Sequence, residues 1–229
     1  LLFWGAFVEK PKPTETNNSI QKEKSIDKSQ NDNNITPNIN QTNLAVSVSR
    51  EASVLKSKRV KIENEKIKGS ISLEGGLIDD ISFKNYKKNI ASNESVSFLN
   101  PKETNDSYFV ETGWTSVGRL IDVPTNKSIW SIIGNDTLSL NRPVILQWVN
   151  DKGLIFKKKI EIDDKYLFTI SQEIKNNSNK VIELYPYAQI TRKKIPDDFQ
   201  GFYISHEGFI GVFDGELKED DYDDIEEKK

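Results

Sequence analysis

The sequence predicts an all-β protein with the form of a large antiparallel β-sandwich, and two observations support this prediction. Four apolar runs between Val144 and Arg192 are separated by the turn-forming clusters 151–153, 163–165 and 176–179. Short runs rich in Val, Ile, Phe and Tyr and interrupted by Gly, Asp and Asn are typical of antiparallel strands joined by tight connections. Apolar and polar residues also alternate along these runs, which places one face of the sheet on a core and the other in water.

The alternation also predicts which side chains form the core. We expect five side chains to be buried: Trp148, Phe156, Ile160, Phe168 and Ile170. The same faces hold Leu154, Ile162, Tyr166 and Ile174, whereas the opposite faces hold Lys157, Lys159, Glu161, Thr169 and Glu173. Trp114 and Trp130 are interpreted as core residues too, because aromatic side chains in a sandwich are more often core than part of a sugar-binding cleft.

The chain before this region predicts further strands. Alternating apolar residues indicate strands at 59–64 and 66–73, joined by a turn at 64–65, and a third at 77–83. The pair Gly75-Gly76 between them indicates a tight turn or a bulge. Beyond these, the sequence predicts a turn at 85–89, an irregular stretch at 90–105, a strand at 108–110 and a short, ambiguous segment at 128–132.

Composition divides the chain into three parts. Residues 1–9 (LLFWGAFVE) are apolar but too short to span a bilayer, which needs about 20 residues. Two interpretations fit them, a short buried segment or the end of a transmembrane helix. We favour the helix, because the polar tract that follows cannot pack against such a segment. That tract, residues 10–54, lacks the apolar density of an ordered domain and is predicted to be a disordered linker. Residues 55–229 then form the sandwich domain.

The sequence shows no recognisable catalytic, metal or cofactor site. It has no Cys, which excludes disulfides, thiolate ligands and thiol catalysis, and its net charge of −3 gives no reason to expect nucleic acid. The single histidine, His206, precedes Glu207, and neighbouring residues on a strand point to opposite faces. A structural role is therefore predicted for His206. The acidic segment 216–227 lacks the glycine and ligand spacing of a calcium loop and is expected to be solvated and to enter a helix.

Several segments, in this order and spacing, resemble a known family. They are GGLIDDISFKNY (75–86), RPVILQWVNDKGLIFKKKIEI (142–162), YLFTISQEIKNNS (166–178), LYPYAQITR (184–192) and GFYISHEGFIGVFDGELKE (201–219). From about Leu55 onward the chain is similar to the large first periplasmic domain of the YidC membrane protein insertases of the Oxa/Alb family, closest to the alphaproteobacterial branch. The segment LLFWGAFVEKP resembles the outer end of that family's first membrane helix.

The resemblance implies both a fold and a function. The fold would be a β-supersandwich like that of galactose mutarotase, and comparison with the family implies that it is incomplete at its C-terminus here. The function would be to insert and fold inner-membrane proteins, alone or with the Sec translocon, without a cofactor and without covalent chemistry. The expected partners are SecDF, SecYEG and nascent membrane proteins, with this domain in the periplasm. The alternative is a carbohydrate-binding or mutarotase-like domain, which rests on fold analogy alone.

A protein-binding surface is predicted in the segment 180–213. This segment leaves the regular strand pattern and places Lys193, Lys194, Asp197 and Asp198 around a proline. Loops held by a rigid scaffold are where contacts usually concentrate. We therefore expect these four residues to contact a partner and the domain to bind rather than catalyse.

Overall fold

The computed structural model describes residues 48–119, 121–196 and 206–227. The membrane segment predicted at 1–9 and nearly all of the linker predicted at 10–54 lie outside the described residues. Within those that are described, no helix combines the length and the apolar character needed to cross a membrane.

The described residues form mostly β-strands. In chain order the elements are α1 (Arg50–Val54), β1 (Arg59–Glu63), β2 (Ile67–Ser72), β3 (Leu77–Lys87), β4 (Ser95–Leu99), β5 (Tyr108–Thr115), the 3₁₀ turn η1 (Val117–Arg119), β6 (Ser131–Ile133), β7 (Thr137–Leu138), β8 (Val144–Val149), β9 (Leu154–Ile162), β10 (Phe168–Asn176), β11 (Tyr185–Arg192), β12 (Gly208–Phe213), β13 (Glu216–Asp221) and α2 (Tyr222–Glu227). The all-β prediction is confirmed, and so is the helix expected in the acidic segment.

The larger sheet has seven strands in the order β11-β5-β3-β2-β1-β7, with β4 also paired to β3. Its pairs are antiparallel except for β1 and β7, which run parallel. Two predictions for this region are wrong: β3 continues to Lys87 through the expected turn at 85–89, and β4 lies inside the stretch expected to be irregular. The end of β3 is solvent-exposed and pairs with β4 across register shifts, so it lacks the apolar alternation that identifies a strand.

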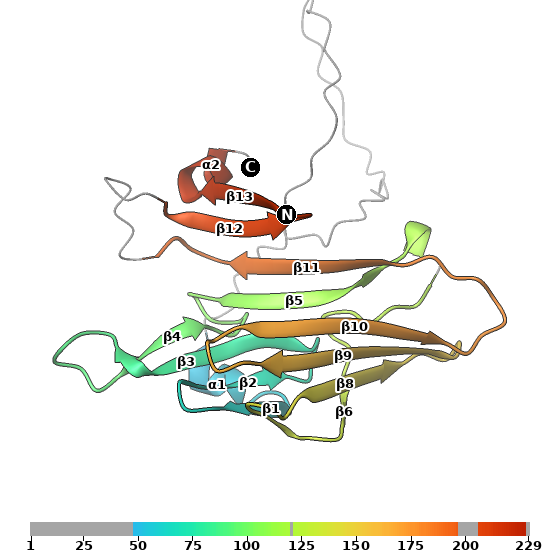
Figure 1. The fold of residues 1–229 in the computed structure, drawn as a ribbon, viewed down its shortest axis with the longest axis horizontal. Helices are drawn as coiled ribbons and strands as arrows, with labels where there is room; N and C mark the ends of the chain where they lie inside the picture. The colour runs from blue at the N-terminus through green and yellow to red at the C-terminus, as the bar shows by residue number, and fades with distance from the viewer. Residues whose placement is uncertain (1–47, 120, 197–205, 228–229) are drawn as a thin grey trace, which may run out of the picture. The chain divides into compact units, whose positions relative to one another are not determined.

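The second sheet has four strands in the order β10-β9-β8-β6, and in Figure 1 it lies over the strands β1 to β3 of the larger sheet. Three strands of the region 144–192 therefore pair as a meander, as predicted. The fourth, β11, instead crosses to the larger sheet and pairs with β5, with Tyr187 opposite Gly113. The alternation of a strand shows which of its faces is apolar, but it does not show which sheet the strand joins.

The core lies between the two sheets. Phe156 and Ile160 of β9 are 0% and 1% exposed, which confirms their predicted burial. The rings of Trp114 and Trp130 are stacked with centroids 6.4 Å apart, and Trp114 meets Phe156 edge-on at 5.2 Å. The remaining predicted core residues, Trp148, Phe168 and Ile170, are only partly buried. For the last two the reason is that β10 is an edge strand of its sheet in the described part of the chain.

The short helix α1 holds the beginning of the described chain on the larger sheet. Ser49 caps its first turn, and the Arg50 guanidinium donates hydrogen bonds to the side chains of Asp80, Ser82 and Ser97. Ser53 donates to Glu103 at 2.5 Å. Order therefore begins before residue 55, where composition places the boundary. A helix of five residues is too short to show a helical period in the sequence.

Candidate protein-binding surface

The predicted contact residues Lys193 and Lys194 directly follow β11, and both are exposed. The backbone N–H of Lys193 donates to the carbonyl of Ser107 at 2.9 Å, which fixes this turn beside the start of β5. The other two predicted residues, Asp197 and Asp198, lie outside the described residues. The structure therefore places two of the four predicted contact residues, Lys193 and Lys194, directly after the paired strand β11.

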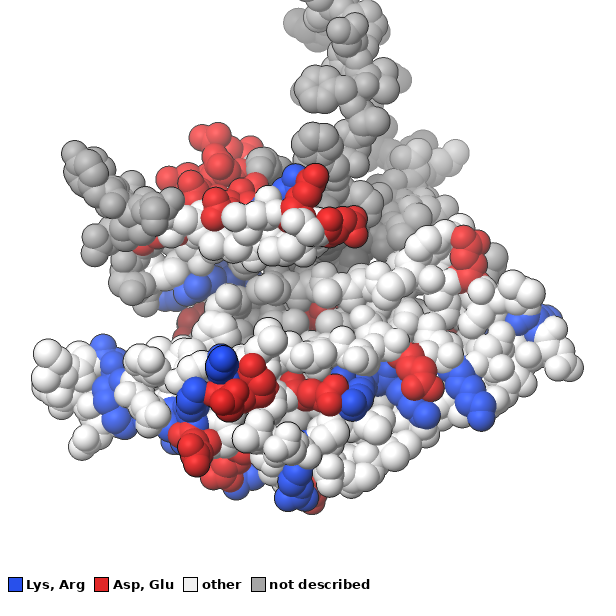
Figure 2. All heavy atoms as spheres, in the orientation of Figure 1, with Lys and Arg blue, Asp and Glu red and all other residues white. Residues whose placement is uncertain are grey.

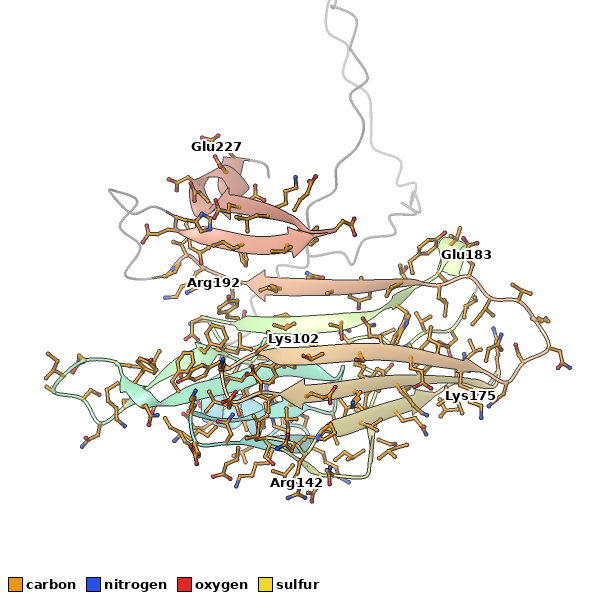
Figure 3. The ribbon with its side chains drawn as sticks, viewed as in Figure 1. Lys102, Arg142, Lys175, Glu183, Arg192 and Glu227 are labelled. Carbon is orange, nitrogen blue, oxygen red and sulfur yellow. The ribbon has the colours of Figure 1, made fainter. Side chains whose placement is uncertain are left out.

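Arg192, the last residue of β11, connects three elements at this position. Its guanidinium lies over the rings of Tyr108 of β5 and Tyr222 of α2, at 4.8 Å and 5.8 Å from the centroids. It also donates hydrogen bonds to the Tyr222 hydroxyl at 3.0 Å and to the carbonyl of Lys194 at 3.2 Å. Burial raises the pKa of the Tyr108 hydroxyl, although the charge of Arg192 opposes this shift. Figure 3 shows Arg192 at the end of β11, far from Lys175 at the end of β10.

A groove of about 360 Å³ lies beside this cluster and is formed mainly by β4, the start of β5 and the end of β11. Its lining combines aromatic and aliphatic side chains with three cations and one acid. The lining residues are Lys88, Val96, Ser97, Phe98, Asn100, Asp106, Tyr108, Arg192, Lys194, Ile195 and Pro196. Phe98 is 44% exposed and packs edge-on against Tyr108. Protein-binding patches commonly combine aromatic residues and arginine with other polar side chains.

The hairpin β12–β13 exposes several large apolar side chains. Ile210, Val212, Phe213 and Leu217 are each 58% to 67% exposed. Val212 and Leu217 are directly paired across the hairpin. Acidic side chains surround them, and the red surface over β13 and α2 in Figure 2 shows this acidic character. Ile210, Val212 and Leu217 share one face of the hairpin, whereas Phe213 lies on the other. Exposed apolar residues with a polar rim mark interaction sites on soluble domains.

His206 contacts the hairpin β12–β13. Its Nδ1 lies 2.8 Å from Asp221 Oδ1, while the backbone carbonyl of Glu207 accepts a hydrogen bond from Tyr222. His206 lines neither the groove described above nor a second hollow, of about 630 Å³, between α1 and the larger sheet. In that hollow the main cation, Arg50, already pairs with Asp80. Across the described ranges, no three His, Cys, Asp or Glu side chains gather as metal ligands.

Sequence reasoning missed Arg192, Tyr108 and Tyr222 as a cluster. Tyr108 and Arg192 are paired in the register of β5 and β11, and Tyr222 joins them through the fold of the hairpin. The only signal in the sequence was an arginine at the end of an apolar strand. Because the pairing of β11 with β5 was not predictable, the contact between these residues was not predictable either.

The described residues thus form a domain of two packed sheets and a separate β12–β13 hairpin, with a charged groove at the end of β11 and exposed apolar side chains on the hairpin. Comparison with protein families gives a more specific assignment. The family model described as the YidC periplasmic domain matches residues 59–229. The chain belongs to this family of inner-membrane insertases, and its described domain is the periplasmic one.

Individual relatives agree with the family assignment. The chain is 38% identical over its whole length to "Membrane protein insertase YidC" of Pelagibacter ubique, of which it covers 40%. Proteins with the same name from Methylobacterium radiotolerans and Roseobacter denitrificans are 42% and 41% identical over 78% of this chain, which covers 29% and 30% of them. The chain therefore spans well under half the length of these relatives.

Proposed function

We propose that this domain is a non-catalytic protein-binding part of a membrane protein insertase, which helps to insert and fold inner-membrane proteins alone or with the Sec translocon. The observation that supports this most directly is the groove at the end of β11. It offers Phe98, Tyr108 and Ile195 beside the cations Arg192 and Lys194. Such a lining suits a polypeptide with apolar and acidic side chains and has no arrangement suited to covalent chemistry.

The proposed contact surface consists of the 360 Å³ groove, the turn at Lys193-Lys194 and the exposed face of the β12–β13 hairpin. Cations predominate in the groove and the turn, where Asp106 is the one acid of the groove lining, whereas acids predominate on the hairpin, which carries the lysine Lys218. A partner therefore meets charges of opposite sign on the two halves, and this fixes its orientation. SecDF, SecYEG and nascent membrane proteins are the partners we propose, since relatives of this chain are named membrane protein insertases.

The test is a double charge reversal, Lys193→Glu with Lys194→Glu. Binding of purified SecDF and of SecYEG to the 229-residue chain is measured by surface plasmon resonance at low and high salt. We expect association to weaken about tenfold, roughly 1.4 kcal/mol, because charges at an interface rim act mainly on the rate of encounter. The thermal midpoint should change little, because exposed charges contribute about 0–1 kcal/mol to folding.

The matched control is Lys152→Glu with Lys175→Glu, which makes the same change in net charge at exposed positions near the far end of β10 and outside the segment 180–213. The control should bind like the original chain. Equal binding by all three proteins would remove this surface from consideration. Turnover of an aldose by the chain, lost in His206→Ala, would overturn the non-catalytic proposal and favour the mutarotase-like alternative.

A further inference from the structure

A lysine interrupts the apolar inner face of β9. Lys158 lies between Phe156 and Ile160 on that face and is 1% exposed. Its neighbours in the sheet are Leu146 of β8 and Gln172 of β10. Because side chains alternate along a strand, Lys158 points to the same face as the core residues. A charged side chain would be expected on the solvent-exposed face instead. A fully buried lysine has to find hydrogen-bond acceptors for three N–H donors or lose stability.

Lys158 has fewer hydrogen-bond acceptors near its ammonium group than it has N–H donors. Among the described residues its Nζ gives one hydrogen bond, to the carbonyl of Gly75 at 3.4 Å, which is long for such a bond. The ammonium lies over the Trp130 ring, 4.6 Å from its centroid, which supplies a cation–π contact but no lone pair. Burial lowers the pKa of Lys158 to about 8, while the Glu111 carboxylate raises it. The amine therefore remains protonated at neutral pH.

A second buried donor faces the same place. Trp130 is 2% exposed, and its Nε1 has no hydrogen-bond partner within the described part of the chain. A Cβ atom built on Gly76 would stand 3.2 Å from both Lys158 Nζ and Trp130 Nε1, so the two nitrogens converge on this glycine. Gly76 has a φ of 63° and no side chain, so no Cβ atom occupies the position 3.2 Å from both nitrogens. Buried donors of this kind are nearly always paired in folded proteins.

Residues from both sheets bring Lys158 Nζ and Trp130 Nε1 together. Lys158 comes from the four-stranded sheet, whereas Gly75 and Gly76 form the turn between β2 and β3. Trp130 is held there by its backbone N–H, which donates to the carbonyl of Leu73 at 2.8 Å. Gln172, next to Lys158 in the sheet, is only partly buried and lies on the edge strand β10. One strand therefore separates the Lys158 amine from the edge of its sheet, which is a short route for a small solute.

We propose that Lys158 Nζ and Trp130 Nε1 form an internal binding site for one small hydrogen-bond acceptor, either a water molecule or a halide ion. The chemistry shared by the two is a compact, electron-rich atom that accepts from an ammonium and an indole N–H together. Water satisfies both donors while the site keeps its positive charge, and a halide also neutralises it. Each buried water normally has about three hydrogen bonds, and the Gly75–Gly76 backbone lies next to these donors.

Nuclear magnetic resonance of the ¹⁵N-labelled 229-residue chain tests this proposal at the indole N–H of Trp130. The chain has four tryptophans, so Trp130→Phe identifies the signal and Trp148→Phe serves as its control. Sodium chloride, bromide and sulfate are compared at matched ionic strength, and a cross-peak from the indole proton to long-lived water is recorded. Lys158→Met removes one donor, and Lys157→Met changes a lysine on the opposite face of the same strand.

A shift of the Trp130 signal with chloride or bromide, absent with sulfate, identifies the acceptor as a halide. A water cross-peak without halide dependence identifies it as water. Either effect should be lost in Lys158→Met and kept in Lys157→Met. The absence of both effects in the original chain would overturn the proposal, and so would an effect that persists in a folded Lys158→Met protein. The measurement on the original chain is decisive even if a variant fails to fold.

Discussion

The titration of a single side chain, that of Lys158, is expected to make the stability of this domain depend on pH. Its pKa is about 8 in the folded chain, because burial disfavours the charged amine, compared with 10.5 when exposed. Between these values the unfolded chain binds more protons, so stability rises as pH increases from about 8 to 10.5. Below about pH 8 the amine is protonated in both the folded and the unfolded chain. Burying the charged amine then costs its full amount, about 3 kcal/mol at roughly 1.4 kcal/mol per pKa unit.

Lys158→Met should therefore stabilise the protein. We expect the free energy of unfolding at pH 7 to increase by about 1–3 kcal/mol, as seen when buried charges are replaced by apolar side chains of similar volume. The rise in stability above pH 8 should also disappear. Urea denaturation at a series of pH values measures both effects, with Lys157→Met as the control. An unchanged pH profile in Lys158→Met would show that another group causes the dependence.

The strands β9 and β10 are expected to contribute differently to the stability of the domain, although apolar and polar residues alternate in the same way along both. β9 lies between β8 and β10 and its inner side chains are fully buried, whereas those of β10 are partly exposed. Alternation in the sequence predicts both inner faces correctly, and the structure confirms them. It does not predict the difference in burial, which depends on the position of each strand in its sheet.

Two matched substitutions separate the contributions of these strands. Phe156→Ala should lower the free energy of unfolding by about 3–5 kcal/mol, because the side chain is completely enclosed and leaves a cavity. Phe168→Ala should cost clearly less, because water can fill the space at an edge. Chemical denaturation measures both values. Equal losses would mean that β10 is covered on its free side.

Arg192 is expected to hold the hairpin β12–β13 and α2 against the end of β11. Arg192→Ala removes the hydrogen bond to Tyr222 and both ring contacts. Hydrogen–deuterium exchange should then become faster in residues 208–221 and remain unchanged in β9. Arg142→Ala, at an exposed turn, is the control. Unchanged exchange in the hairpin would show that other contacts hold it.

The described residues belong to one compact unit, in which the two sheets are linked by side chains as well as by the core. Gln172 of β10 donates to the carbonyl of Gly113 of β5 at 2.8 Å, and Lys158 reaches the Gly75 carbonyl of the larger sheet. Trp114 and Trp130 lie between the sheets, so their fluorescence reports on their packing. These links predict that neither sheet is stable without the other.

Unfolding should accordingly occur in a single transition. Tryptophan fluorescence and far-ultraviolet circular dichroism should give the same midpoint in guanidinium chloride, as in a two-state domain. Midpoints that differ between the two signals would mean that one sheet persists after the interface between them has opened.

Local patterns in this sequence determine strands and faces, whereas its site depends on pairings that join distant segments. The strands at 59–63 and 67–72 and the inner residues of β9 follow from alternation and turn residues. The contact role of Lys193 and Lys194 is predicted from their position in an irregular, charged segment. The cluster of Arg192 with Tyr108 and Tyr222, and the convergence of Lys158 with Trp130, depend on which strands become neighbours. Nothing within either segment specifies that choice.

The crossing of β11 to the larger sheet has a consequence for how the chain folds as it is synthesised. Tyr187 of β11 bonds to Glu111 of β5, 76 positions earlier in the chain. When the N-terminal part emerges first, β5 has an open edge throughout the synthesis of β6 to β10, and an open edge can pair with foreign strands. Pairings over such separations form late. The groove beside Arg192 thus exists only after β11 has paired with β5, so a partner that binds it distinguishes domains in which this pairing has formed from those in which it has not.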